Sequence, residues 1–515
     1  MKKYIIKSVF LISVFLCIGC SGEEYLDKQP PDQLTSENFW RNAEDARSGL
    51  TAAYSELEAR SNFWDGWQEG RSVVEYFRSD YALPGPDASN YSHWMSIYNF
   101  NYTNGHIFLD VLWSTNYKGI NFSNQVIKNV TEMTADQISE GEKEQILGEA
   151  YFLRAYYHFK LLTLFEQIII RDEVITTTTL DKALASRSEA WDFLLQDFET
   201  AANKLEFNID PQDYGRANKA AALGYLGKAY MYKAGDDTSS SVDDYQKAAD
   251  AFSKVIESGQ YALEDDFKSL FNGNNENNKE SIFELQFKSG DANSWNATRL
   301  HSFVGDWAIG GWGGIVADDR LVDKMKTEGM IAEDGLYDSR LYATLYFDDP
   351  YFNDESAKRM EGSTWDTLIE ATYGDADAKD DVAFFRKWLP EPLEGNGYIG
   401  LNVTLLRYAD VLLMYAEALN EIGTTGEAIE LINKVRNAHG NMPPVNPNTK
   451  EAVFDQLVHE RIMELSLEST RFFDLRRWGM LEGAMTAANR SGFSAQEHAY
   501  LPIPLSELQT NTKIE

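Results

Sequence analysis

Apolar residues recur at helical spacing over most of this 515-residue chain. Because residues three and four apart share one face of a helix, this spacing predicts amphipathic helices. The predicted helices cover residues 43–57, 108–130, 136–165, 188–205, 217–234, 243–258, 404–421, 425–438 and 450–467. A short strand candidate lies at 281–287. The pattern therefore predicts a mainly α fold with a few short strands.

Some of these helices form pairs that carry small residues where two helices must pack closely. Ala220, Gly224 and Gly227 recur in one helix, and alanines recur in the next helix along the chain. The two helices within 217–258 resemble a tetratricopeptide repeat, a helix hairpin of about 34 residues. A second such hairpin is predicted at 404–438. Because the hairpins are scattered rather than tandem, they favour a helical scaffold with large insertions over a simple solenoid.

Two loop-rich segments interrupt the scaffold. The first, at about 61–107, is rich in aromatic residues, Asn, Ser and Gly, and Pro84 and Pro86 break any helix there. The second, at about 270–400, contains a Gly- and Trp-rich stretch at 304–315. Long loops on a rigid frame commonly carry function, so we expect the ligand side here. The scaffold itself is predicted to cover about 37–60, 108–260 and 401–480.

The N-terminal residues form a candidate export signal. Lys2, Lys3 and Lys7 are basic, and residues 9–18 form an apolar stretch that is too short to span a bilayer. The small Gly19 directly before Cys20 is typical of bacterial lipoproteins, which are cleaved and lipidated at that cysteine. We predict a signal peptide at 1–19, a lipidated tether at 20–36 and a single domain at 37–515. The alternative is an ordinary signal peptide with a chance cysteine.

Charge narrows the range of partners. The chain has 47 basic and 81 acidic residues and a net charge of −34. Such an acidic chain repels phosphate backbones, which argues against nucleic acid as a partner. No apolar run after the signal reaches the length of about 18 residues that indicates a membrane helix. The lipid on Cys20 is therefore predicted to be the only membrane attachment.

No catalytic or metal-binding motif stands out. The seven histidines form no zinc-hydrolase arrangement, and neither a phosphate-binding loop nor a serine-hydrolase elbow is present. The acidic run at 375–381 has Lys379 where a calcium ligand belongs and lacks the required glycine. Carboxylate pairs suited to glycoside hydrolysis arise by chance among 81 acidic residues, and nothing singles out one pair. We predict that the chain is not an enzyme and has no cofactor or metal.

A series of short sequence blocks runs nearly from end to end. The blocks are the tether at 20–31, the helix residues Trp113, Tyr117, Ile120 and Asn124, and the segments Glu149–Tyr156, Gly215–Ala221, Arg407–Ala418, Glu460–Arg461, Arg471–Trp478 and Leu501–Pro504. In this order they resemble the SusD-like (RagB/SusD) outer-membrane lipoproteins of nutrient uptake. The run Glu166–Ile170 departs from the family, which usually has a Gly and a Pro there.

The resemblance implies both a fold and a function. It implies a SusD-like fold and a surface-exposed, lipid-anchored position on the outer membrane. It also implies that the chain captures an oligosaccharide or polysaccharide and acts as the lid of a SusC-like TonB-dependent transporter. Most residues of the matching blocks are predicted to belong to the scaffold. Arg407, Asp410 and Glu417 stand at helical spacing in an otherwise apolar helix. Ion pairs and cap contacts that lock helices together are predicted for Glu460, Arg461, Asp474, Arg476 and Arg477.

Glycan binding needs aromatic faces for the C–H face of a sugar ring and polar side chains for its hydroxyls. Both loop-rich segments offer such residues, and the resemblance places the ligand surface of the family in roughly these regions. The candidates are Trp64, Trp67, Arg71, Asn90, Tyr91 and Trp94 in the first segment, and Asn293, Trp295, Arg299, Trp307 and Trp312 in the second. Alternatively, some tryptophans are core residues under loops, and the two arginines are structural ion pairs.

Two other functions stay open at this point. The same lid role could serve a peptide or another nutrient, since the family includes such members. A surface-anchored glycoside hydrolase is the weaker alternative, because no acidic pair is singled out.

Overall fold

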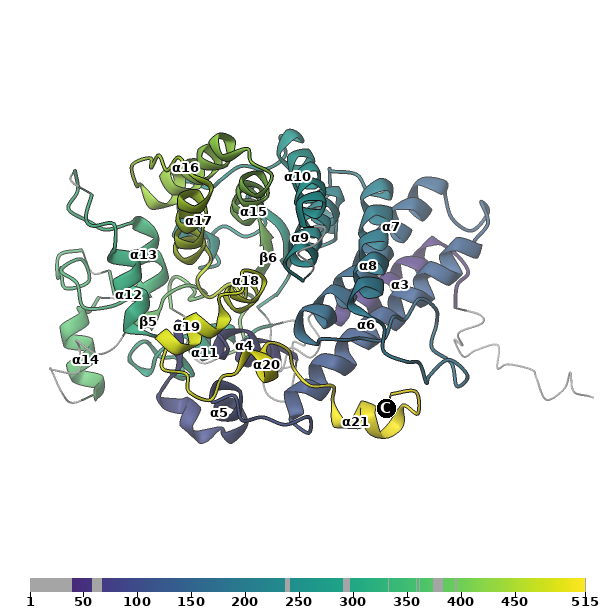
Figure 1. Cartoon of the computed structure of the whole chain (residues 1–515), viewed down its shortest axis with the longest axis horizontal. Coiled ribbons are helices and arrows are strands. Elements are labelled where there is room, and N and C mark those ends of the chain that lie inside the picture. Colours follow the sequence, from purple (N-terminus) through teal and green to yellow (C-terminus); the bar gives the residue numbers. More distant parts are fainter. Residues whose placement is uncertain are drawn as a thin grey trace, which may run out of the picture.

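The computed structural model describes residues 39–57, 67–236, 241–289, 297–331, 333–357, 359–360, 362–373, 383–393, 395 and 397–514. Successive antiparallel helices pack side by side along its longer axis (Figure 1). They are α3 (Ala43–Ser55), α6 (Ile107–Glu132), α7 (Glu140–Leu164), α8 (Arg187–Lys204), α9 (Lys219–Asp236), α10 (Ser241–Glu257), α15 (Tyr408–Glu421), α16 (Thr425–Gly440) and α17 (Lys450–Leu465). This arrangement confirms the mainly α scaffold that the hydrophobic spacing predicts.

Local sequence signals explain where these helices begin and how closely they pack. Ser186 and Glu189 form a complete capping box at the start of α8. In α9, a Cβ built on Gly227 would lie 2.5 Å from Cε1 of Phe252 on α10, so only glycine allows this approach. The small residues of the predicted hairpin therefore set the distance between its two helices.

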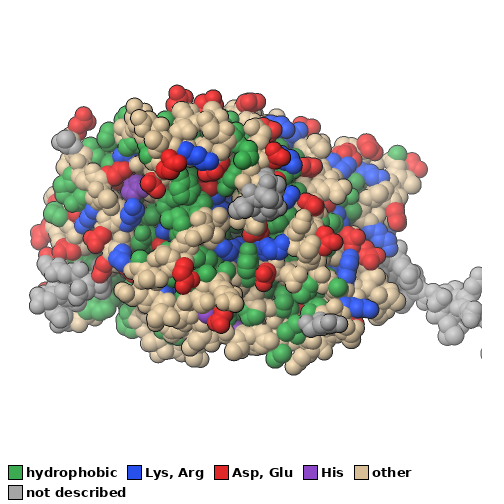
Figure 2. All heavy atoms as spheres, in the orientation of Figure 1, with side chains coloured by type: hydrophobic (Ala, Val, Ile, Leu, Met, Phe, Trp, Pro, Cys, Tyr) green, Lys and Arg blue, Asp and Glu red, His purple; other side chains and the backbone are tan. Residues whose placement is uncertain are grey.

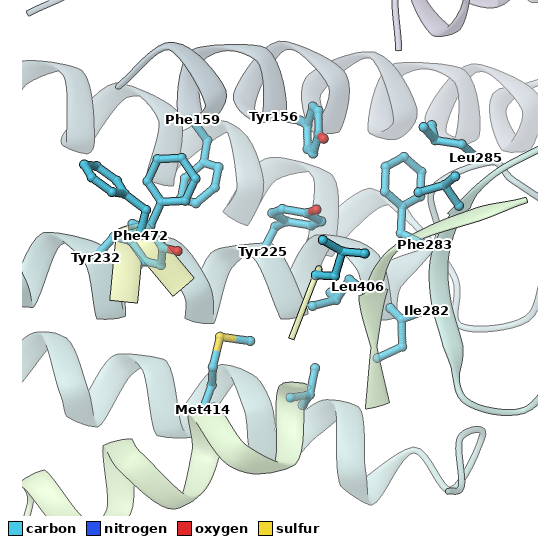
Figure 3. Packing of buried hydrophobic residues seen from close by; sticks show 14 of the residues in the cluster. Tyr156, Phe159, Tyr225, Tyr232, Ile282, Phe283, Leu285, Leu406, Met414 and Phe472 are labelled. Carbon is cyan, nitrogen blue, oxygen red and sulfur yellow. The ribbon is translucent and has the colours of Figure 1, made fainter. Parts of the chain in front are cut away.

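The core between the helices is rich in aromatic rings. Figure 3 shows Tyr156 of α7 and Tyr225 of α9 beside Phe283, which comes from strand β2. The ring centroids of Tyr156 and Tyr225 are 5.1 Å apart and the rings are nearly perpendicular, the edge-to-face geometry that aromatic pairs favour. The buried apolar residues form one contiguous cluster that reaches from Ala46 to Leu501. The insertions therefore pack on the same core as the scaffold.

The remaining elements are short and lie mostly in the insertions and at the C-terminus. Among the described residues, three two-stranded antiparallel sheets pair β1 with β3, β2 with β6 and β4 with β5. The strands are β1 (Ala82–Pro84), β2 (Ser281–Leu285), β3 (Ile315–Ala317), β4 (Leu345–Tyr346), β5 (Phe384–Phe385) and β6 (Val403–Arg407). The other helices are α4 (Trp67–Phe77), α5 (Ser92–Tyr98), α11 (Leu300–Val304), α12 (Asp319–Lys326), α13 (Ser339–Thr344), α14 (Trp365–Tyr373), α18 (Arg471–Arg477), α19 (Leu481–Ala487), α20 (Ala495–His498) and α21 (Leu505–Thr510). Short 3₁₀ turns are η1 (Pro86–Asn90), η2 (Pro211–Asp213), η3 (Phe267–Leu270) and η4 (Trp307–Ile309).

Two sequence-based boundaries were wrong. The segment 61–107 contains the helices α4 and α5, because Val73, Val74 and Phe77 give α4 a buried apolar face among its polar residues. Residues 403–407 form strand β6 rather than the first turn of a helix, because they pair with β2. The predicted strand at 281–287 is confirmed in its first five residues.

The charged residues of the C-terminal blocks lock helices together, as the sequence predicts. Arg461 of α17 donates to Asp410 of α15 and Asp474 of α18, both at 2.8 Å. Arg477 of α18 donates to Glu417 of α15 and to Asp474. We call these groups the ion-pair junction; its members are Arg407, Asp410, Glu417, Glu460, Arg461, Glu464, Asp474 and Arg477. All of them are buried.

The signal peptide, Cys20 and the tether at 20–36 lie outside the described residues. Within the described part of the chain, no helix has the length and apolar character needed to cross a membrane.

Candidate ligand-binding surface

The two predicted ligand segments meet at a small antiparallel ribbon. Strand β1 pairs with β3, so that Pro84 lies opposite Ile315. The pairing continues beyond the strands, because the backbone N–H of Gly85 donates to Gly314 and that of Asp87 donates to Gly313. The fold thus brings η1 and its neighbours beside the Gly- and Trp-rich loop, more than two hundred residues further along the chain.

Trp307 is the most exposed tryptophan that the structure describes there. It is 50% exposed and starts η4, whose cap is Asp306. The backbone N–H of Gly311 donates to the Asp306 carbonyl, and a Cβ at Gly311 would lie 1.9 Å from the carbonyl oxygen of Gly305. Only glycine allows this tight return of the loop. The loop therefore presents the Trp307 ring to solvent on a firmly held backbone.

Behind this loop, a buried carboxylate supports the turn. The Tyr373 hydroxyl donates to Asp306 at 2.9 Å, and the Ala308 N–H donates to Asp306 Oδ1, also at 2.9 Å. Burial raises the pKa of Asp306, and these two hydrogen bonds oppose the rise. Asp306 is thus committed to holding the turn that carries Trp307.

Arg299 joins two further rings to the surface. Its guanidinium carbon lies 4.1 Å from the ring centroid of Tyr398 and 5.5 Å from that of Trp312. Backbone hydrogen bonds in both directions between Thr298 and Ile399 fix Tyr398 beside Arg299. Arg299 makes no ion pair with the described residues, and its Nε has no hydrogen-bond partner among them. Within the described residues, the guanidinium is therefore held by ring faces rather than by a carboxylate.

The first segment contributes Tyr91 and Asn90 and a supporting tryptophan. Asn90 is exposed, and its amide donates to Asp87 at 2.9 Å. Tyr91 is half-buried and stacks on Trp94 with ring centroids 4.3 Å apart. Trp94 is 0% exposed, and its Nε1 donates to Glu69 at 2.6 Å. The prediction that Trp94 offers a face to a ligand is corrected, because the ring is covered and supports Tyr91 from below.

The other residues that the sequence predicts as ligand contacts either have a structural partner elsewhere or lie outside the described residues. Arg71 of α4 pairs with Glu75 at 3.2 Å and lines an internal cavity of about 40 Å³ with Lys160 and Lys228. It is thus the structural ion pair that the sequence left open as an alternative. Trp64, Asn293, Trp295, the side chain of Trp67 and the acidic run at 375–381 are outside the described part of the chain.

Sequence reasoning missed Tyr398, Asp306 and Tyr373. Tyr398 follows Gly395 and Gly397, so it carries the same signal of an aromatic residue in a Gly-rich loop that selected Trp307. The roles of Asp306 and Tyr373 depend on a contact between residues 67 positions apart, which no local pattern reveals. We call Asn90, Tyr91, Arg299, Trp307, Trp312 and Tyr398 the aromatic surface.

The described residues hold two groups of His and carboxylate side chains close enough to share a metal ion. They are Glu280, His439 and Glu464, and Glu328, His459 and Glu460. Each group already contains an arginine bound to its carboxylates: Arg407 contacts Glu280 and Glu464, and Arg436 contacts Glu328 and Glu460. Cations of the protein thus take the place that a metal would need.

Charge is unevenly distributed over the outer surface. Figure 2 shows acidic side chains along the upper rim, around α10 and α16, with basic side chains gathered nearer the middle of this face.

Comparisons with known proteins agree along the whole chain. The model of the SusD family matches residues 279–515, and a model described as "Starch-binding associating with outer membrane" matches residues 24–231. The SusD-like protein P38 of Formosa agariphila is 27% identical over 100% of this chain and 99% of its own length.

Solved structures show the same fold. A SusD superfamily protein from Bacteroides vulgatus has a TM-score of 0.79 and 25% identity, over 93% of this chain and 99% of that chain. Surface glycan-binding protein A from Bacteroides thetaiotaomicron, solved with laminarihexaose, has a TM-score of 0.72 and 19% identity, over 91% and 98%. With family models that match residues 24–231 and 279–515 and relatives that align over nearly its whole length, the chain is a SusD-like protein.

Proposed function

We propose that this protein binds a glycan on the aromatic surface, without turning it over, and delivers it to a SusC-like TonB-dependent transporter in the outer membrane. The observation that carries the proposal is the exposed Trp307 ring, in the same loop as Trp312, together with Arg299, which lies against the rings of Trp312 and Tyr398. Aromatic faces suit the C–H face of sugar rings, and Asn90 and Arg299 supply hydrogen-bond donors for hydroxyls. The relative that was solved with laminarihexaose supports a carbohydrate ligand.

The surface is suited to holding a chain rather than to cleaving it. Hydrolysis needs two carboxyl groups placed on either side of a sugar linkage. Asp306 is occupied by Tyr373 and by the backbone of η4, and Asp87 accepts from Asn90. Asp306 and Asp87, two carboxylates next to the aromatic surface among the described residues, therefore have structural partners, which supports binding without catalysis.

The proposed location follows from the N-terminal sequence and the family. Cleavage at 1–19 and lipidation of Cys20 would leave the tether at 20–36 to join the domain to the outer leaflet of the outer membrane. Replacing Cys20 by Ser should release the protein from the membrane fraction, and labelling with a radioactive fatty acid should then fail. Retention of the label in that variant would contradict lipidation at Cys20.

The glycan proposal is tested by affinity gel electrophoresis of the soluble chain from Ser21 onward. The gels should contain laminarin, starch and a series of other neutral and acidic polysaccharides. We expect at least one polysaccharide to retard the protein, and Trp307→Ala to weaken that binding about tenfold, or about 1.4 kcal/mol. Leu180→Ala is the matched control, because Leu180 is 55% exposed and lies outside the aromatic surface.

Two outcomes would redirect the proposal. If no polysaccharide retards the wild-type chain, a peptide or another nutrient becomes the better ligand class for the same lid role. If reducing ends accumulate when the protein is incubated with a polysaccharide, the protein is a hydrolase.

The transporter partnership is tested separately, by extraction from native membranes in a mild detergent. A lid must bury a large interface against its transporter. If this protein is extracted only as a monomer, the partnership is contradicted.

A further inference from the structure

An open cavity lies on the scaffold, and residues outside the aromatic surface form it. Its volume is about 380 Å³, within the range typical of small-molecule sites. It is bounded by the loop between α8 and α9, by Gln260 and Tyr261 after α10, and by the start of β2. None of the residues that line it belongs to the aromatic surface.

The walls of this cavity combine rings with amides. Tyr214 is 45% exposed at the edge, and Tyr261 is half-buried, with its hydroxyl accepting from Asn218 at 2.8 Å. The side-chain amides of Asn208 and Gln260 are exposed and have no hydrogen-bond partner among the described residues. Each such amide can both donate to a ligand and accept from it.

The cavity also contains a buried carboxylate that no cation neutralises within the described residues. Glu284 of β2 is only 4% exposed. Its Oε1 accepts from the Asn402 amide at 2.8 Å and the Asn277 N–H at 3.2 Å, whereas Oε2 has one long contact of 3.4 Å with the Thr404 hydroxyl. Oε2 therefore retains capacity to accept a hydrogen bond from a ligand.

In a neighbouring cavity, by contrast, charged residues of the lining form ion pairs with one another. That cavity, of about 260 Å³, shares Arg216 and contains Glu149, Glu142 and Arg47. There Arg216 pairs with Glu149 at 3.2 Å, and Arg47 pairs with Glu142 at 2.9 Å. Lys279, which also lines the larger cavity, lies 3.8 Å from a different carboxylate, that of Glu264. A carboxylate without an ion pair among the described residues, Glu284, thus distinguishes the larger cavity.

We propose that this cavity is a second binding site, which takes a single neutral sugar ring. Tyr214 would cover the C–H face of the ring, and Asn208, Gln260 and Glu284 would bind its hydroxyls. A neutral ring fits better than an anion, since Glu284 would repel a negative charge. The site goes beyond the function proposed above, because it does not depend on Trp307 or its neighbours.

The test uses saturation-transfer NMR on the soluble chain from Ser21 onward. The probes are the methyl glycosides of glucose, galactose, mannose, xylose and fucose. The background is Trp307→Ala with Trp312→Ala, so that the aromatic surface contributes little. We expect saturation transfer to at least one glycoside, and about fivefold weaker binding when Tyr214→Ala is added, as one lost ring contact would give.

Two further variants distinguish the loss of a contact in the cavity from a general change in the loop. Gln212 lies in η2, in the same loop as Tyr214, but does not line the cavity. Gln212→Ala should therefore leave the saturation transfer unchanged. Asn208→Ala removes an exposed amide and should weaken binding without changing the melting temperature. Absence of transfer to every glycoside would overturn the proposal, and so would transfer that Tyr214→Ala does not reduce. Neither result would affect the Trp307 experiment, so the two proposals can fail separately.

Discussion

The ion-pair junction and the aromatic surface use the same kinds of side chain in opposite ways. In the junction, Arg407 is buried and contacts the carboxylates of Glu280, Glu464 and Glu468. On the aromatic surface, Arg299 lies against the rings of Tyr398 and Trp312 and has no ion pair within the described residues. Arg407 thus has its hydrogen-bonding capacity used by the protein, whereas the Nε of Arg299 has no hydrogen-bond partner among the described residues.

The tryptophans show the same contrast. Trp94 is covered and donates its Nε1 proton to Glu69, whereas the Trp307 ring is half exposed at the tip of a glycine-supported turn. Residue type alone therefore does not identify a site. What distinguishes the two regions is whether the bonding capacity of a group is already used inside the protein.

The largest effect is expected from breaking the junction. Arg407→Ala would leave three buried carboxylates without their shared cation and should lower the free energy of unfolding by about 5 kcal/mol. Urea unfolding followed by circular dichroism measures this change. Arg299→Ala is the matched control and should change stability by less than about 0.5 kcal/mol. Equal losses in both variants would remove the distinction between the two regions.

The two tryptophans give the next largest contrast. Trp94→Ala should cost about 4 kcal/mol of stability, because it empties a fully buried ring site and leaves the buried Glu69 without the Trp94 donor. The free energy of unfolding of Trp307→Ala should stay within about 0.5 kcal/mol of that of the wild type. The same unfolding experiment measures both. A large loss for Trp307→Ala would show that its ring supports the fold rather than a ligand.

A smaller effect is expected from the proton on His439, which contacts Glu464 of the junction. Burial alone would lower the pKa of His439, but the charges of Glu464 and Glu280 outweigh it and raise the pKa to about 9. A raised pKa stabilises the fold fully below the unfolded value of about 6.5, and this contribution is lost as the pH rises through 9. Between these pH values it should fall by about 3 kcal/mol, since one pKa unit is worth about 1.4 kcal/mol.

Unfolding measured at a series of pH values tests this expectation. In His439→Gln, the decline between pH 6.5 and 9 should largely disappear, because glutamine has no proton to lose. An unchanged decline in that variant would place its origin in another group.

The sequence was sufficient to predict the scaffold because its signals are local. Helical spacing, small residues and capping residues located α6 to α10 and α15 to α17 to within a few residues. Ion pairs of Glu460, Arg461, Asp474 and Arg477 were also predicted, and the sequence showed that Asp410 and Glu417 are charged residues in an otherwise apolar helix. Such residues need internal partners once they are buried.

The site was only partly predictable because its geometry depends on contacts between distant segments. Sequence placed Tyr91, Arg299, Trp307 and Trp312 in two loops, but the pairing of β1 with β3 brings those loops together. Nothing local distinguishes the covered Trp94 from the exposed Trp307. The carboxylate of Glu284 illustrates the same limit, because its lack of a cation is a property of the assembled cavity.

The smallest effect should come from Arg299 itself, and it depends on the ligand. With a neutral polysaccharide, Arg299→Ala should weaken binding about threefold, because it removes one hydrogen-bond donor and the cation that orders two rings. With an acidic polysaccharide the loss should be larger, because a charge-assisted hydrogen bond is roughly twice as strong as a neutral one. Affinity electrophoresis in gels of both kinds measures the ratio of the two losses. If Arg299→Ala leaves binding unchanged in both gels, Arg299 serves only to position Tyr398 and Trp312, and its role matches that of the junction arginines.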